Sequence, residues 1–187
     1  MSYAYGTEEW EKAYLEMVAI RLATVSKPYI QGSPEWVATY EKLIQESQEY
    51  NEAAKGWEGT VVIHIMPNPE LGLDADVYQL LDLWHGECRS VRLVPQEAGE
   101  KADYILSGEL ARWEAVVAGD LETTKAMMQG KIKLKGDLAT IVRYVKASTL
   151  LTEIAARMET KFLSQLSEEE REQYRKEAAK LRAEFGF

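Results

Sequence analysis

The segment Gly119–Leu138, with the sequence GDLETTKAMMQGKIKLKGDL, constrains the fold of this chain more than any other stretch. Gly119-Asp120-Leu121 predicts the start of a short helix with Asp120 as its N-cap, because an aspartate side chain can accept the unpaired N–H groups of a first helical turn. Gly130 predicts the end of that helix, since glycine readily takes the left-handed conformation that follows many helices.

An amphipathic strand and a second helix are predicted directly after it. The run Lys131-Ile132-Lys133-Leu134-Lys135 alternates, so Ile132 and Leu134 point to one face and the three lysines to the other. Gly136-Asp137-Leu138 then predicts the start of a longer helix. Since helix, strand and helix follow one another so closely, their apolar faces must share one core or one cavity.

The rest of the chain predicts an α+β fold. Helical patterns cover residues 7–25, 33–56, 109–118 and 138–158, with Thr7 and Ser33 as N-caps and a break expected at residues 147–149. Another helix follows a capping box at Ser167 and Glu170. Strand patterns cover Thr60–Met66, Val77–Trp84, Cys88–Val94 and Ala102–Ser107. Five mostly consecutive strands predict a largely antiparallel sheet with helices packed on one face.

Composition excludes several classes of protein. The net charge of −9 over 187 residues argues against a nucleic-acid-binding protein and against stable attachment to anionic membranes. The single cysteine, Cys88, excludes an intrachain disulfide and favours a reducing compartment. No apolar run approaches the ~20 residues needed to span a bilayer, and the N-terminus is neither basic nor continuously apolar. We therefore expect a cytoplasmic protein.

Two motifs carry a resemblance to a known family. Met127–Leu138 resembles the pattern F/M-x-G-K-h-K-h-x-G-D/N, with h apolar, near the end of the sterol-carrier-protein lipid-binding domain. Ala102–Ser107 resembles the strand opening A-D-h-x-h of the same family. Their order and spacing match over Ser33–Met158. The resemblance implies a sheet whose helices enclose a hydrophobic cavity or tunnel, within a lipid-binding domain at 33–160. Residues 1–32 are then an N-terminal helical extension and 161–187 a charged C-terminal helix.

Apolar and aromatic residues are the candidate ligand-binding residues, because ligand pockets are mostly apolar and flexible methionines suit adaptable pockets. The sequence alone does not distinguish a filled core from a cavity, and it is the resemblance that favours a cavity. The candidates are Trp84, Trp113, Val117, Met127, Met128, Ile132, Leu134, Leu138, Ile141, Tyr144 and Val145.

No residue is assigned to catalysis or to a metal. His85-Gly86-Glu87-Cys88 contains metal-binding side chains, but it lies in a predicted hairpin turn and lacks the paired spacing of a structural zinc site. The chain contains neither a G-x-S-x-G motif nor a glycine-rich phosphate-binding loop. A cofactor is not expected.

The predicted function is binding and transfer of a hydrophobic ligand such as a fatty acid, acyl-CoA, a sterol-like molecule or a related lipid. Lys131, Lys133 and Lys135 either face solvent or meet an anionic head group.

Two alternatives remain open. One is an interaction module with a solid core that docks a partner or forms a homodimer. The other is a hydrolase acting on a hydrophobic ester or thioester, with His64 or His85 as its base.

Overall fold

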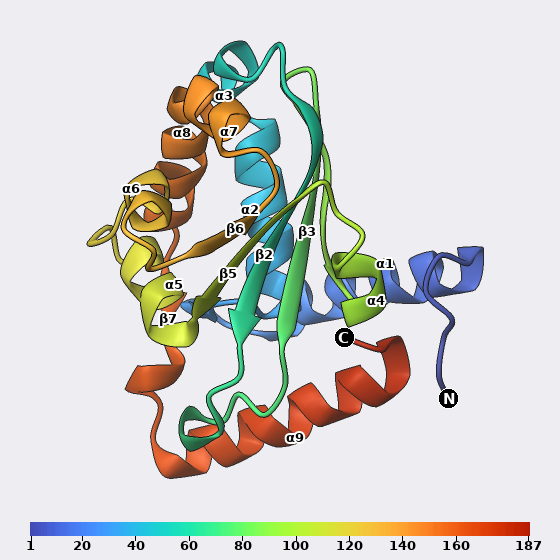
Figure 1. The fold of residues 1–187 in the computed structure, drawn as a ribbon. Helices are drawn as coiled ribbons and strands as arrows, with labels where there is room; N and C mark the ends of the chain where they lie inside the picture. The colour runs from blue at the N-terminus through green and yellow to red at the C-terminus, as the bar shows by residue number, and fades with distance from the viewer.

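A single mixed sheet lies at the centre of the computed structural model, which describes residues 1–187 (Figure 1). Its strand order is β4-β3-β2-β5-β6, and β2 pairs antiparallel with β3 but parallel with β5. The other neighbours are antiparallel, which confirms the predicted α+β fold with a largely antiparallel five-stranded sheet. The strands are β2 (Glu58–Met66), β3 (Val77–Trp84), β4 (Glu87–Val94), β5 (Tyr104–Glu109) and β6 (Lys133–Lys135).

Helices cover one face of this sheet, where α2, α5, α6 and α8 gather, while α4 lies on the other side and α9 crosses beyond one end (Figure 1). None of the helices combines the length and apolar composition needed to cross a lipid bilayer. The helices are α1 (Glu8–Thr24), α2 (Pro34–Gln45), α3 (Gln48–Ala53), α4 (Gln96–Gly99), α5 (Leu110–Val117), α6 (Thr123–Met128), α7 (Leu138–Arg143), α8 (Val145–Ala156) and α9 (Glu168–Phe185).

A short parallel pair ties the two ends of this helical layer together. β1 (Tyr29–Ile30) precedes α2, and β7 (Thr160–Lys161) follows α8. Tyr29 pairs with Thr160, and the N–H of Gln31 donates to the carbonyl of Lys161 at 3.1 Å. The entry to α2 is therefore positioned by the chain that leaves α8.

Most predicted helix starts are confirmed. The hydroxyls of Thr7 and Ser33 accept the N–H groups of Trp10 and Trp36, and Ser167 and Glu170 form a reciprocal capping box. The predicted start of α6 at Asp120 is wrong, because the carboxylate of Glu122 caps α6 by accepting from the N–H groups of Thr124 and Lys125.

The segment after α6 departs from a simple strand pattern. Gly130 has φ 73°, the left-handed conformation predicted after the helix. The N–H groups of Lys131 and Ile132 both donate to the carbonyl of Ala126, at 2.9 and 3.3 Å. These two residues therefore complete the end of α6, and the strand begins only at Lys133.

Two predicted helices are each divided. The helix predicted over 33–56 breaks before α3, because Ser47 is extended and its hydroxyl caps the N–H of Tyr50. Asp137 starts α7 as predicted, but the break before α8 lies at Tyr144 and not at residues 147–149. Tyr144 has φ −102° and ψ 28°, and its ring packs edge-on against Trp57 with centroids 5.4 Å apart. Its hydroxyl lies over Gly56, where a Cβ would collide with it.

The C-terminal aromatic residues pack against α1. Phe185 is 2% exposed, and its carbonyl accepts from Nε1 of Trp10 at 3.0 Å. The ring of Phe187 packs edge-on against Tyr14, whose hydroxyl accepts the N–H of Leu93 at 3.0 Å. The end of α9 is thus attached to α1 and, through Tyr14, to β4.

Replacing Phe185 by alanine removes a buried ring from this cluster, and we expect it to lower the free energy of unfolding by about 3–5 kcal/mol. Urea denaturation followed by tryptophan fluorescence measures the change. The half-buried Phe187, replaced in the same way, serves as the control and should cost clearly less. An unfolding transition unaffected by Phe185→Ala would show that α9 does not stabilise the rest of the molecule.

Candidate ligand-binding site

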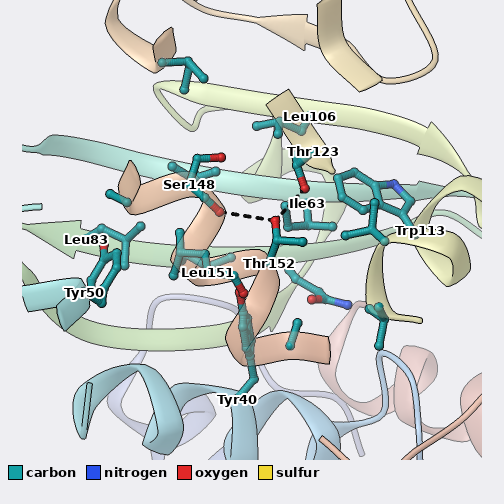
Figure 2. A pocket seen from close by; sticks show the side chains of 18 of the residues that line it. Tyr40, Tyr50, Ile63, Leu83, Leu106, Trp113, Thr123, Ser148, Leu151 and Thr152 are labelled. Atoms are coloured by element: carbon teal, nitrogen blue, oxygen red, sulfur yellow. Dashed lines mark hydrogen bonds between the residues drawn. The ribbon is translucent and has the colours of Figure 1, made fainter. Parts of the chain in front are cut away.

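A largely apolar cavity of about 100 Å³ lies between the sheet and its covering helices (Figure 2). Of the 23 residues that line it, 18 are hydrophobic. Alternation along the strands explains its floor, because residues at every second position point to the same face. Those pointing toward the helices are Val61 and Ile63 of β2, Gln79, Leu81 and Leu83 of β3, and Leu106 of β5.

Aromatic side chains anchored by hydrogen bonds form much of the wall. Nε1 of Trp113 donates to the carbonyl of His64 at 3.0 Å, and Nε1 of Trp36 donates to Oγ1 of Thr160 at 2.9 Å. The Tyr40 hydroxyl donates to the carbonyl of Leu151 at 2.8 Å. Each ring therefore spans a gap between two elements with its polar atom satisfied, and rotation of a ring into the cavity would break that bond.

The wall carries no formal charge, because none of the 23 lining residues is acidic, basic or a histidine. Two of its tyrosines stay neutral as well. Burial raises the pKa of Tyr40 and of Tyr50 far above the ordinary value for a phenol. A ligand in this cavity therefore meets an uncharged surface at any physiological pH.

Three residues with hydroxyl groups line the cavity where α6 packs against α8: Thr123, Ser148 and Thr152. The hydroxyls of Thr123 and Thr152 lie 2.9 Å apart, and Thr152 also donates to the carbonyl of Ser148 at 3.2 Å (Figure 2). The hydroxyl of Ser148 lies 3.3 Å from that of Thr124. Because all three hydroxyls have partners within the protein, they present little unsatisfied polarity to the cavity.

Two glutamines are the other polar residues of the wall. Nε2 of Gln31 donates to the carbonyl of Trp113 at 3.1 Å, while its Oε1 is buried without a partner. Gln79 lies on the inward face of β3, is 4% exposed, and forms no side-chain hydrogen bond within the protein. Oε1 of Gln31 is thus a fully buried acceptor without a partner in the wall, and the Gln79 amide also keeps its hydrogen-bonding groups unused.

Of the eleven candidate residues, five line the cavity. Trp113 and Val117 come from α5 and Met127 from α6, while Ile141 and Tyr144 come from α7 and its end. The structure thus brings together side chains from three successive helices, α5, α6 and α7, although β6 lies between α6 and α7 in the sequence.

Two candidates are core residues outside the cavity. Ile132 is 1% exposed and lies close to Gly108, and Leu134 packs against the core from β6. They stabilise the edge of the sheet beside the site without reaching the open space.

The remaining four candidates are exposed. Met128 is 71% exposed because it lies one residue, about 100° of helical rotation, beyond Met127. Leu138 and Val145 point outward at the starts of α7 and α8. Trp84, at the end of β3, stacks on His85 with centroids 4.8 Å apart and does not line the cavity.

Sequence reasoning missed the aromatic wall from the N-terminal half and the strand floor. Trp36, Tyr40, Tyr50 and Trp57 line the cavity. The helical spacing of the first three is also typical of a solid core. A signal for Gln79 was available, because it interrupts an inward row of β3 that otherwise holds Val77, Leu81 and Leu83.

The lysines of β6 face away from the cavity. Lys133 pairs with Ser107 and Lys135 with Ile105, whereas Leu106, the residue between, lines the cavity. Paired residues share a face of the sheet, so both lysines project from the opposite face. They do not reach a ligand held inside.

The histidines also lie outside the cavity. Nδ1 of His64 is 2.8 Å from Oγ of Ser107, and its Nε2 is 2.7 Å from Oδ1 of Asp76. This cluster has the residue types of a serine hydrolase, but Ser107 lies mid-sheet between β2 and β6, where backbone N–H groups belong to the strand ladders. His85 is exposed and bonds Glu58 at 2.6 Å.

Metal binding and thiol chemistry find no support in the side-chain positions. No three histidine, cysteine, aspartate or glutamate side chains converge on one point where a metal ion could bind. Cys88 is buried, and burial raises the pKa of its thiol to about 12. A thiol of this kind is a poor nucleophile at neutral pH.

We expect Cys88 to react slowly with a thiol reagent such as 5,5′-dithiobis(2-nitrobenzoate) in the native protein. A pKa near 12 in place of the ordinary 9.0 lowers the thiolate population at pH 8 by about a thousandfold. Stopped-flow absorbance measures the rate, and the same protein in urea is the control. Native and unfolded protein reacting equally fast would mean that this region is open to solvent.

Comparison with known proteins agrees with this architecture. Residues 40–147 match the model of the SCP-2 sterol transfer family. A crystal structure of sterol carrier protein 2 is 35% identical with a TM-score of 0.64, and the match covers 68% of this chain and 98% of that one. A Thermus thermophilus protein described as a possible sterol carrier protein is 34% identical with a TM-score of 0.65, covering 73% and 94%. No curated protein sequence matches the chain.

The family model covers more than half of the chain, and it includes the Met127–Leu138 motif that carries the resemblance. The inward row of β3, the aromatic residues Trp57 and Trp113, and the helices α5 to α7 all fall within the matched residues. The chain therefore belongs to the SCP-2 sterol transfer family.

Proposed function

We propose that this protein binds and transfers a lipid, holding the apolar part of a fatty acid, acyl-CoA, sterol-like molecule or related amphiphile in the cavity. The observation that carries the proposal is the uncharged cavity of about 100 Å³, lined by 18 hydrophobic residues, in a member of this family. Each methylene that leaves water for such a surface gains roughly 0.8 kcal/mol, so sequestration requires no bond-making step.

Loading a long chain requires the helical layer to move. A cavity of about 100 Å³ accommodates part of an acyl chain, so the wall must open as more of the chain enters. Helices α6 and α7 suit this movement, because each has six residues and they flank Gly130 and Gly136, both at positive φ. We infer that these two helices shift outward while the sheet stays fixed.

The two alternative functions are less well supported. A solid-core interaction module does not account for the cavity, nor for the unpartnered Oε1 of Gln31 in its wall. A hydrolase using His64 would need its substrate on the opposite face of the sheet. The pocket lined by its neighbours Asp76 and Tyr78 is smaller, about 70 Å³, and only 9 of its 18 lining residues are hydrophobic. The structure thus favours storage of a ligand over its cleavage.

Native mass spectrometry of freshly purified protein, followed by organic extraction, tests the proposal. We expect an adduct of lipid mass that a Met127→Trp variant loses, because the larger ring fills the space beside the buried Met127. Met128→Trp is the matched control, since Met128 is 71% exposed and outside the cavity, and it should keep the adduct.

The proposal would be wrong if delipidated wild-type protein bound neither fatty acids, acyl-CoA nor sterols. Equal loss of the adduct in both methionine variants, with folds intact by circular dichroism, would also count against this cavity as the binding site.

A further inference from the structure

We propose that Gln31 and Gln79 form a polar subsite that accepts an uncharged hydroxyl group of the ligand and disfavours an ionised carboxylate. The inference rests on the proposed function, since it concerns which head group enters the same cavity. Two buried amides in the largely apolar wall suggest this subsite, because each has hydrogen-bonding groups that the protein does not use.

Gln31 supplies the acceptor. Its amide orientation is fixed because the neighbouring group is the carbonyl of Trp113, which can only accept, so the nitrogen must face it. Oε1 is then directed elsewhere, and it is buried without a partner on a residue that is 7% exposed. A buried acceptor without a donor is unfavourable, so a ligand that brings an O–H or N–H gains by filling this position.

Gln79 supplies the donor. Its side chain is 4% exposed and forms no hydrogen bond with the protein, although it lies among apolar neighbours of the inward row. Its Nε2 lies close to Gly32, where a Cβ would stand 3.3 Å from that nitrogen. Gly32 directly follows Gln31 in the chain, and both glutamines line the same cavity. Gly32 also has φ 80°, a conformation that favours glycine.

The two amides together fit a hydroxyl group better than a carboxylate. A hydroxyl donates one hydrogen bond and accepts others, so it can donate to Oε1 of Gln31 and accept from Nε2 of Gln79. An ionised carboxylate only accepts, which leaves Oε1 unsatisfied and facing a negative charge. No cation among the lining residues would neutralise that charge away from water.

The expected ligands are therefore uncharged lipids that carry a hydroxyl, and long-chain alcohols, monoacylglycerols and sterols share this chemistry. A fatty acid can still bind with its chain inside and its carboxylate in solvent. The subsite distinguishes ligands by the polar group that reaches the two amides, while the hydrophobic surface supplies most of the binding free energy.

Three probes with the same twelve-carbon chain test the subsite at pH 8 on delipidated protein: dodecan-1-ol, its methyl ether and dodecanoate. The ether keeps the acceptor oxygen and removes only the donated hydrogen. We expect the alcohol to bind about tenfold more tightly than the ether, the difference that one hydrogen bond makes, and more tightly than dodecanoate. Isothermal titration calorimetry measures the three affinities.

Two variants separate the roles of the amides. Gln31→Met should reduce binding of the alcohol about tenfold and leave the ether nearly unchanged, because only the alcohol donates to Oε1. Gln79→Leu should weaken the alcohol and the ether together, because both accept from Nε2. Leucine also suits the inward row of β3, so this variant keeps the fold even if Gln31→Met loosens the contact with Trp113. Gln129→Leu, on the surface, is the control.

Results that overturn the subsite differ from those that overturn the cavity. Equal binding of alcohol and ether by the wild type, or tighter binding of dodecanoate, would show that the amides do not select a hydroxyl. The same conclusion would follow if Gln79→Leu bound all three probes as the wild type does. Failure of the wild type to bind any of the probes would instead contradict the proposed lipid-binding function.

Discussion

The cavity depends on large aromatic side chains that hold the helices away from the sheet. Trp36, Tyr40 and Trp113 each fix a polar atom to another part of the chain, at Thr160, Leu151 and His64. A collapsed core would bury more apolar surface, but it would also break these bonds and leave their partners unsatisfied. The helical layer is thus kept at a distance by hydrogen-bonded rings, and the inward row of the sheet is left partly uncovered.

This arrangement divides affinity from selectivity. The apolar floor and the neutral wall favour the chain of any lipid, because burial of methylene groups is non-directional. Discrimination then comes from polar groups that the wall leaves without partners, among them the amides of Gln31 and Gln79. The hydroxyls of Thr123 and Thr152 contribute less, since they are already bonded to each other.

The sequence allowed the fold to be predicted better than the site. Alternation placed Val77–Trp84 with the bounds that β3 has, because strand periodicity is a local property. Which of Met127 and Met128 faces the cavity depends on where α6 starts, and the shift of its cap from Asp120 to Glu122 was not visible in the motif. Gln31 could not be found, because its role arises from a contact with Trp113, 82 residues away in the sequence.

The short β1–β7 pair has a consequence for how ligand preference can diverge among relatives. Gln31 is held by the carbonyl of Lys161 and Trp36 by the hydroxyl of Thr160, and all four residues lie outside the segment 40–147 that the family shares. Most of the cavity is thus formed by the shared segment, whereas Gln31, one of the two glutamines of the polar subsite, belongs to the flanking sequence. Substitutions in those flanks can retune the cargo while the shared scaffold is conserved.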